Sequence, residues 1–245
     1  MTTVHVAPTR YTHQEFERAV LSLSPSVAVF DCDGTLWSGD AGYGFMIWSI
    51  ESGLVSRNAS DWIDSRYRQY LAKEISEAEM CGEMVQIYAG LQEAEIRKAA
   101  AEYFRLHIES HIFPEMHALI ARLQADRVAI WAVSSTNNWV IEEGVRRFNI
   151  PASRVLSARV RVEPDGHISS DLIDVPTDEA KATALRKAGV PNPDVVFGNS
   201  VHDAAMLEIA RGAFPVNPTP ALAEIAAKKN WSVFYPESVL ADTKL

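Results

Sequence analysis

The sequence has few cysteines, a shortage of positive charge and no long hydrophobic run, and each shortage excludes a class of protein. Two cysteines in 245 residues, Cys32 and Cys81, are too few for a disulfide framework. The formal net charge of -9 at pH 7 argues against nucleic acid or an anionic membrane as a partner. No apolar stretch is long enough to span a membrane, and Met1 to Arg10 shows no signal-peptide pattern. We therefore expect a cytoplasmic protein.

The remaining composition is that of a protein with a real core. Hydrophobic residues make up 47% of the chain, and the length allows one domain with an insertion, or two. There is no internal repeat and no low-complexity tract. Apolar runs alternate with helical patterns, which is typical of a parallel sheet flanked by helices. Candidate strands outside the motifs below are 154–158, 213–216 and 231–235, and 160–174 is typical of a small hairpin around Pro164-Asp165-Gly166.

The most informative stretch is Phe30-Asp31-Cys32-Asp33-Gly34-Thr35-Leu36, at the end of an apolar run that predicts a buried strand. Open α/β sheets bind ligands where their strands end, and residues two apart share a face of an extended chain. We therefore expect Asp31 and Asp33 to face a ligand together. Gly34 allows a turn and Thr35 offers a hydroxyl, whereas Cys32 should point into the core. An ordinary polar turn is the alternative.

A second apolar run, 128–133, ends at Ser134, and Thr136-Asn137-Asn138 then opens a predicted helix. The first amides of that helix would favour an anion. A plain helix cap would use the same residue types. Ser135 is an adjacent candidate, so the assignment is open by one residue.

Two further segments supply a cation and oxygen ligands. Lys181 lies in the first turns of a predicted helix, and Lys187 lies further along it and is less well placed. A last apolar run ends in Gly198-Asn199-Ser200, with Asp203 behind it. An amide oxygen ligates a hard cation weakly and without charge, so Asp203 is the stronger candidate donor.

In this order the four segments resemble the motifs of the haloacid dehalogenase superfamily, and the resemblance spans about residues 27–216. It implies a Rossmann-like α/β fold with a parallel sheet. It also implies that Asp31 attacks phosphorus, that Asp33 acts as acid and base, and that three side chains hold the phosphoryl oxygens: Thr35, Ser134 and Lys181.

The resemblance also implies a Mg²⁺ ion. Its expected ligands are Asp31, the backbone carbonyl of Asp33, Asn199 and Asp203. The superfamily's fourth motif is Gly-Asp-x-x-x-Asp, and this sequence departs from it because Asn199 stands at the first acidic position.

Roughly ninety residues without a strand signal separate the first two motifs, which is long for a plain crossover. Ser76-Glu77-Ala78-Glu79 has capping-box spacing, Leu91 to His111 has a helical pattern, and Pro114 should open the next helix. We therefore predict a helical cap domain over 39–113 and an α/β core over 1–38 and 114–245. A cap excludes water from a reacting centre.

This layout resembles the phosphoserine phosphatase branch of the superfamily. In that branch an acidic residue nine positions after the nucleophile contacts the substrate's amino group, and here that position is Asp40. The branch also grips the substrate carboxylate with an arginine of the cap. Met84 occupies that position here, which leaves three possible substitutes: Arg57, Arg66 and Arg68.

Aromatic residues beside Asp40 suggest a second option. We expect Trp37, with Ser135, to contact the substrate, and Tyr43, Phe45 and Trp48 crowd the same entrance. Aromatic faces beside a carboxylate suit an amine or quaternary ammonium group. The same spacing is also typical of core packing.

The resemblance thus implies a Mg²⁺-dependent phosphomonoester hydrolase that forms an aspartyl-phosphate and acts on a small phosphorylated metabolite. An amine-bearing, phosphoserine-like ester is the expected substrate. The alternatives are a phosphocholine or phosphoethanolamine phosphatase, a phosphomutase, and a non-catalytic module that binds a phosphate ligand. We expect a monomer or a homodimer.

Overall fold

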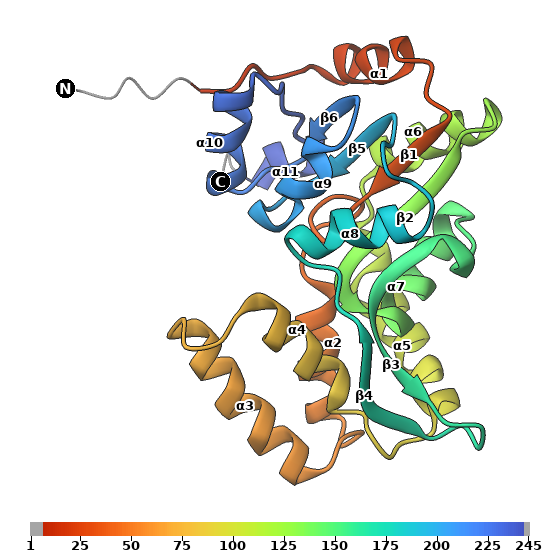
Figure 1. Ribbon diagram of the computed structural model, residues 1–245, viewed down its shortest axis with the longest axis vertical. Coiled ribbons are helices and arrows are strands. Elements are labelled where there is room, and N and C mark those ends of the chain that lie inside the picture. Colours follow the sequence, from red (N-terminus) through yellow and green to blue (C-terminus); the bar gives the residue numbers. More distant parts are fainter. Residues whose placement is uncertain (1–6, 243–245) are drawn as a thin grey trace.

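The computed structural model describes residues 7–242 and contains a six-stranded sheet with helices on both faces (Figure 1). The strand order is β4-β3-β2-β1-β5-β6, and every neighbouring pair is parallel except β3 and β4. The expected α/β fold with a parallel sheet is therefore confirmed. The strands are β1 (Val27–Phe30), β2 (Ala129–Asn137), β3 (Val155–Val162), β4 (Ile168–Asp174), β5 (Val195–Gly198) and β6 (Gly212–Pro215).

The helices surround this sheet and also fill the long stretch between β1 and β2. The α-helices are α1 (His13–Ser22), α2 (Ala41–Glu51), α3 (Arg57–Leu71), α4 (Glu77–Gln86), α5 (Glu93–His107), α6 (Pro114–Ala125), α7 (Asn138–Val145), α8 (Glu179–Lys187), α9 (Ala204–Glu208), α10 (Pro220–Lys229) and α11 (Glu237–Asp242). The 3₁₀ turns are η1 (Glu109–His111), η2 (Arg146–Phe148), η3 (Ala152–Arg154) and η4 (Val201–Asp203).

The central strand β1 is apolar because helices cover both of its faces. Val29 belongs to one buried cluster, whereas Ala28 and Phe30 belong to another. The ring of Phe30 stacks on that of Phe197 in β5, with centroids 4.3 Å apart. Cys32 is fully buried just beyond the strand, as expected. The rigid core thus fixes the strand ends from which the polar motifs project.

The helical insert has the predicted beginning and end. Ser76 forms a capping box with Glu79 at the start of α4, and Pro114 is the first residue of α6. In Figure 1, α2, α3 and α4 lie together beyond the end of β1, and α4 lies beside the long strands β3 and β4. By contrast, α5 packs against the core helix α7, where Arg97 pairs with Glu142 at 2.9 Å. The insert is helical as expected, and the domain boundaries at 39 and 113 remain predictions.

The candidate strands were confirmed except one. The strand at 154–158 and the hairpin at 160–174 are joined, because β3 is one strand that pairs with β2 and then turns back into β4. The expected strand at 231–235 is wrong: Val233 and Phe234 form only isolated bridges. Phe234 pairs with Val216, and the segment around Val216 contains Pro215 and Pro218. These prolines have no N–H group that could extend the pairing.

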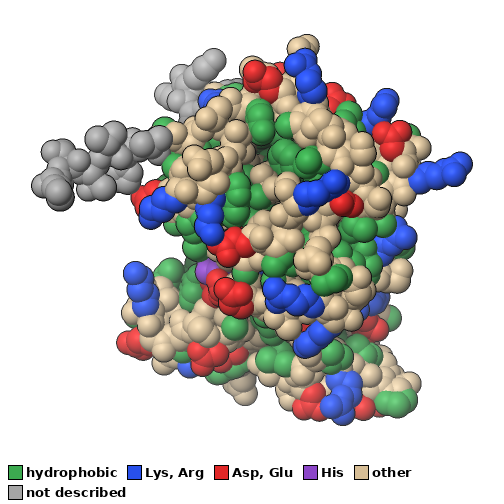
Figure 2. All heavy atoms as spheres, turned by 45° about the horizontal axis from the view of Figure 1, so that its top comes forward, with side chains coloured by type: hydrophobic (Ala, Val, Ile, Leu, Met, Phe, Trp, Pro, Cys, Tyr) green, Lys and Arg blue, Asp and Glu red, His purple; other side chains and the backbone are tan. Residues whose placement is uncertain are grey.

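One face of the molecule carries charges of both signs. On the face shown in Figure 2, acidic and basic side chains are interspersed and no broad basic patch is visible. Within the described residues, no helix has both the length and the apolar character needed to cross a membrane. The absence of a signal-peptide pattern was predicted partly on residues 1–6, which lie outside the described part of the chain.

Candidate active site

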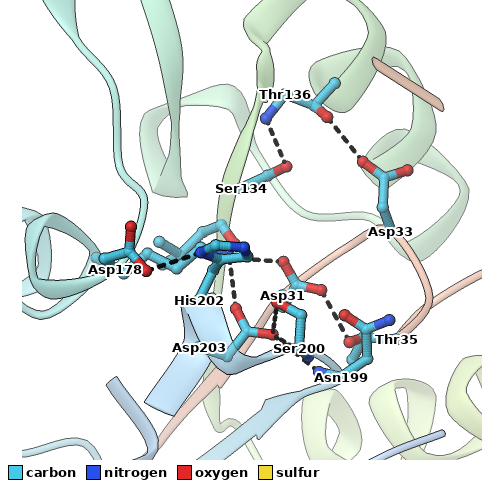
Figure 3. A network of polar contacts seen from close by, with 12 residues as sticks. Asp31, Asp33, Thr35, Ser134, Thr136, Asp178, Asn199, Ser200, His202 and Asp203 are labelled. Atoms are coloured by element: carbon cyan, nitrogen blue, oxygen red, sulfur yellow. Dashed lines mark hydrogen bonds and ion pairs between the residues drawn. The ribbon is translucent and has the colours of Figure 1, made fainter. Parts of the chain in front are cut away.

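The carboxyl ends of β1, β2 and β5 meet next to the helical insert. They line one side of a cavity of about 410 Å³, which is called its floor here. Asp31 and Asp33 follow β1, Ser134 lies near the end of β2, and Asn199 follows β5 (Figure 3). All four line the cavity, as do Lys181 and Ser135. Parallel strands bring these residues to one edge of the sheet although they lie far apart in the sequence.

A buried lysine joins two of the predicted motifs. Lys181 Nζ donates to Asp31 Oδ1 at 2.7 Å and to Asp203 Oδ1 at 2.6 Å, and it also lies 3.3 Å from the carbonyl oxygen of Val133. Its side chain is 2% exposed. The distant Lys187 is exposed on the same helix, so the structure places the first of the two candidate lysines in the site.

The charges in this cluster are not balanced. Burial and the nearby charge of Asp203 raise the pKa of Asp31 above its usual range. Burial alone would lower the pKa of Lys181, but the charges of Asp203 and Asp31 outweigh it and raise that pKa, so the ammonium stays protonated. Two carboxylates and one ammonium leave one negative charge in a buried place, where a further cation would be favourable.

The turn after β1 positions Thr35 and Asp33. Gly34 has a φ of +73°, which turns the chain so that Thr35 Oγ1 donates to Asp31 Oδ2 at 2.9 Å (Figure 3). Asp33 accepts hydrogen bonds from Trp37 Nε1 at 2.8 Å and from Thr136 Oγ1 at 2.8 Å. Burial and the charge of Asp40 raise the pKa of Asp33 to about 7, so this carboxyl can hold a proton near neutral pH.

The second motif supplies hydroxyl groups at the end of β2. Ser134 is buried and its Oγ accepts a hydrogen bond from the backbone N–H of Thr136 at 3.1 Å (Figure 3). Ser135 also lines the cavity. Asn137 caps α7 by accepting from the N–H of Val140. Both serines line the cavity, and the assignment between them stays open.

Asn199 and Asp203, the two metal-ligand candidates that follow β5, have different surroundings. Asn199 lines the cavity, whereas Asp203 is fully buried and does not. Asp203 Oδ2 accepts from the backbone N–H groups of Asn199 and Ser200 at 2.8 and 2.9 Å, and Oδ1 binds Lys181. Asp203 thus orients the lysine and the loop, and the structure gives it no free oxygen toward the cavity.

Gly34 should be intolerant of substitution because it lies against Asn199. A Cβ atom at Gly34 would lie 1.8 Å from Asn199 Nδ2. We expect Gly34→Ala to lower stability by about 1–2 kcal/mol from the positive φ alone and to displace the Asn199 amide. Activity on an aryl phosphate should fall at least tenfold, measured at saturating Mg²⁺.

A matched control separates strain from the clash. Gly53 has a φ of +72°, a Cβ atom added there would have no neighbour within 4 Å, and the residue lies outside the cavity. Gly53→Ala should therefore show the loss in thermal stability that comes from the positive φ alone, together with full activity. Equal activity in both alanine variants would show that the Asn199 side chain is not needed in its present position.

Residues expected to contact the substrate are found in different places. Asp40 lines the cavity and caps α2 by accepting from the N–H of Tyr43 at 2.8 Å. Trp37 instead is fully buried, because its indole donates to Asp33 and packs edge-on against Phe104. Its role is therefore to position Asp33. Phe45 is also buried in the core, so Tyr43 is the member of the expected aromatic group that lines the cavity.

None of the candidate arginines reaches the cavity. Arg66 donates to both carboxylate oxygens of Glu83 at 2.9 and 2.7 Å. Arg57 and Arg68 lie on the exposed face of α3 beside Asp61 and Asp64. Met84, which occupies the position of the branch's arginine, does line the cavity. The expected grip on a substrate carboxylate is therefore missing among the described residues.

Sequence reasoning missed several residues of the cavity wall. Thr136, His202 and three residues of the insert, Tyr67, Tyr70 and Glu77, all line it. Thr136 was assigned only to a helix start and Glu77 only to a capping box. The signal for the tyrosines was their spacing of three on a predicted helix, which places them on one face.

Comparison with known proteins agrees with this geometry. A model of the haloacid dehalogenase-like hydrolase family matches residues 28–208, more than half of the chain. The chain belongs to this family. A histidinol-phosphatase from Neisseria meningitidis serogroup C (strain 8013) is 22% identical over 218 residues, which are 85% of this chain and 97% of the relative.

Solved structures share the fold. A protein of unknown function from Bordetella pertussis Tohama I has a TM-score of 0.75 at 21% identity, over 85% of this chain and 97% of its own. A substrate-bound phosphoserine phosphatase has a TM-score of 0.58 at 15% identity, over 86% of this chain and 92% of its own. The predicted relation to phosphoserine phosphatase-like proteins is thus confirmed for the fold.

The donor atoms in the cavity suit a hard cation. The described residues contain no group of three or more His, Cys, Asp or Glu side chains arranged to hold a metal. At the phosphate end, beside Lys181, the cavity instead offers the Asp31 carboxylate, the amide of Asn199 and the backbone beside Asp33. Mg²⁺ is usually bound by one or two carboxylates with several retained waters, so this set fits Mg²⁺.

Proposed function

We propose that the protein is a Mg²⁺-dependent phosphomonoester hydrolase that acts on a small, amine-bearing phosphate ester through an aspartyl-phosphate on Asp31. The observation that carries the proposal is the arrangement around Asp31. Lys181 and Thr35 orient its two oxygens from opposite sides, and a second carboxyl, Asp33, lines the same cavity. This pair provides a nucleophile and a proton donor within one enclosed site.

In the first half-reaction an oxygen of Asp31 attacks phosphorus while the bond between phosphorus and the ester oxygen breaks. Lys181, Thr35 and Ser134 stabilise the negative charge on the phosphoryl oxygens. Asp33 gives its proton to the leaving alkoxide. Its raised pKa supports this role, because an ordinary aspartate would be deprotonated at neutral pH.

In the second half-reaction Asp33, now a carboxylate, takes a proton from a water molecule that attacks the phosphorus of the aspartyl-phosphate. Inorganic phosphate leaves and the Asp31 carboxylate is restored. The hydrogen bonds from Trp37 and Thr136 to Asp33 keep this carboxyl in place through both steps. Because the same group gives and then regains one proton, the cycle is balanced.

Mg²⁺ would be held by Asp31, the backbone carbonyl of Asp33 and the side-chain oxygen of Asn199, with water completing the shell. When bound, it supplies positive charge between the nucleophilic carboxylate and the phosphoryl group, which otherwise repel each other. The uncompensated negative charge around Lys181 supports this part of the proposal. A cytoplasmic location and a monomeric or homodimeric state remain predictions of the sequence.

The proposal is tested by phosphate release from a panel of esters, with Mg²⁺ and with a chelator. The panel contains p-nitrophenyl phosphate, phosphoserine, phosphoethanolamine, phosphocholine, sugar phosphates and nucleotides. We expect release that depends on Mg²⁺. Rearranged ester without free phosphate would indicate a mutase, and binding without turnover would indicate a phosphate-binding module.

The role of Asn199 leads to a separate prediction. Asn199→Asp should lower the Mg²⁺ concentration for half-maximal activity by on the order of tenfold, because a charged ligand replaces a neutral one. Asn192→Asp is the control, since Asn192 is exposed in the loop before β5. This substitution adds the same negative charge at the other end of that strand. If both variants require as much Mg²⁺ as the unchanged protein, Asn199 does not bind the ion.

A further inference from the structure

The helical insert gives the cavity a negatively charged wall. Glu77, the first residue of α4, lines the cavity together with Asp40, which precedes α2. The Glu77 side chain is 19% exposed, whereas Asp40 is exposed to solvent beside it. The two carboxylates therefore line the same cavity, with Asp40 on its solvent-exposed side.

The partners of Glu77 leave its charge available to a ligand. Tyr70 OH donates to Glu77 Oε2 at 2.5 Å, and Cys81 Sγ donates to Oε1 at 3.5 Å. His202 Nε2 lies 3.8 Å away, and its other ring nitrogen is held by Asp178 at 2.7 Å. Among residues 7–242, no lysine or arginine forms an ion pair with Glu77. Tyr70 and Cys81 orient this carboxylate without neutralising it, and the imidazole of His202 is the nearby base.

Aromatic rings continue the wall beside Glu77. The rings of Tyr43 and Tyr67 lie 4.9 Å apart between centroids, and those of Tyr67 and Tyr70 lie 6.2 Å apart. All three tyrosines line the cavity. A positively charged nitrogen is attracted both to a carboxylate and to the face of a tyrosine ring. The wall therefore favours a cation in the leaving group of the ester.

The same wall disfavours a carboxylate in the leaving group. In the part of the chain that the structure describes, Lys181 is the only lysine or arginine that lines the cavity, and two aspartates already hold it at the phosphate end. A substrate carboxylate near α4 would meet the negative charges of Glu77 and Asp40, and no lysine or arginine of that wall would pair with it; His202 is the base on this side of the cavity. Burying an unpaired charge in this way is costly.

From these contacts we infer that Glu77 binds a positively charged nitrogen of the substrate, and that the substrate is the phosphate ester of an amino alcohol without a carboxylate. This inference rests on the proposed function and narrows it. It separates amino-alcohol phosphates from amino-acid phosphates such as phosphoserine, which carry both charges. Tyr70 fixes the Glu77 carboxylate, and the tyrosine wall contacts the methylene groups around the cation.

The test uses pairs of esters that differ only in charge. The holoenzyme with Mg²⁺ is assayed on ω-aminoalkyl phosphates, beginning with phosphoethanolamine. Each is paired with the alkyl phosphate in which a methyl group replaces the ammonium group, beginning with propyl phosphate. We expect kcat/KM to favour the ammonium ester of a pair, and phosphoserine to be a poorer substrate than phosphoethanolamine. Both comparisons use the unchanged protein, so they do not depend on a variant that folds.

Glu77→Gln then assigns the preference to one residue. It keeps an oxygen that accepts from Tyr70 but removes the charge, so the ratio of kcat/KM between ammonium and neutral ester should fall roughly ten- to a hundredfold, mainly through KM. The disadvantage of phosphoserine should shrink at the same time. Glu74→Gln is the control, because Glu74 is exposed just before α4 and outside the cavity. Its ratio should stay unchanged.

Each outcome decides a different claim. If alkyl and aminoalkyl phosphates are hydrolysed equally well, or if Glu77→Gln leaves the ratio unchanged, the inference is wrong and the proposed hydrolase stands. If phosphoserine is preferred over phosphoethanolamine, the claim against a carboxylate is wrong. If no ester of the set releases phosphate, p-nitrophenyl phosphate included, the proposed function fails and the inference fails with it.

Discussion

Asp31→Asn should reduce phosphate release roughly a thousandfold or more, because an amide cannot attack phosphorus to form the aspartyl-phosphate. The loss should be seen with every ester of the panel, since each of them is cleaved by attack of Asp31 on phosphorus. Acid quenching during turnover should leave a phosphoryl group on the peptide that carries Asp31 in the unchanged protein. The same peptide of the variant should carry none.

The variant should also be at least as stable as the unchanged protein. The folded state raises the pKa of Asp31, so its charged form is less favourable in the folded than in the unfolded chain. That penalty is absent at low pH and develops as the pH rises through the raised pKa. A neutral Asn avoids it, and Lys181 keeps its contact with Asp203. Thermal unfolding in the presence of chelator, at neutral pH, measures this effect.

Asp33→Asn provides the comparison that separates the two carboxylates. A general acid matters most for a poor leaving group, so this variant should lose much more activity on an alkyl phosphate than on p-nitrophenyl phosphate in the first half-reaction. It should still form the phosphorylated Asp31 peptide. If Asp31→Asn turns over any ester at the normal rate, or if the phosphoryl group is found elsewhere, Asp31 is not the nucleophile.

The floor of the cavity was predictable because it follows from local rules. A short apolar run that ends in polar residues marks the carboxyl end of a parallel strand, and parallel strands end at one edge of a sheet. Asp31, Ser134 and Asn199 were found in this way, each from its own few residues. Lys181 needed the resemblance to a family, because a single lysine on a helix is usually an exposed residue.

The wall of the cavity was not predictable in the same way. Glu77 and Tyr70 come from different helices of the insert, and nothing in their local sequence shows that the two helices place them together. Trp37 was expected at the entrance, yet its indole donates to Asp33 from within the core, where it is fully buried. Asp203 was expected at the metal, yet the backbone of its own turn and Lys181 occupy its oxygens. Such outcomes depend on packing between distant segments.

Lys181→Met should abolish activity and also destabilise the fold, and in this it differs from Asp31→Asn. Lys181 is the shared cation between Asp31 and Asp203, and all three side chains are buried. Removing one partner of a buried ion pair costs about 3–5 kcal/mol, because the other charge is left without compensation. Here two carboxylates are left, and their mutual repulsion is added. Thermal unfolding and phosphate release measure the two effects.

Lys187→Met is the matched control, because Lys187 is exposed on the same helix and pairs with none of the site residues. It should leave stability and activity unchanged. This result would assign the role in the site to Lys181 and not to Lys187, the other candidate lysine in the sequence. The stability deficit of Lys181→Met should shrink as the pH is lowered, because protonation of Asp31 removes the repulsion, and loss of the Lys181 charge raises the pKa of that carboxyl further than in the unchanged protein.

The double variant Lys181→Met with Asp31→Asn tests the origin of the deficit. If repulsion between Asp31 and Asp203 causes part of it, removing the Asp31 charge should restore part of the stability and none of the activity. The two substitutions would then be non-additive, as expected for residues in direct contact. Strict additivity would mean that Lys181 stabilises the fold through Asp203 and Val133 alone, and that the buried charge on Asp31 is compensated by another cation.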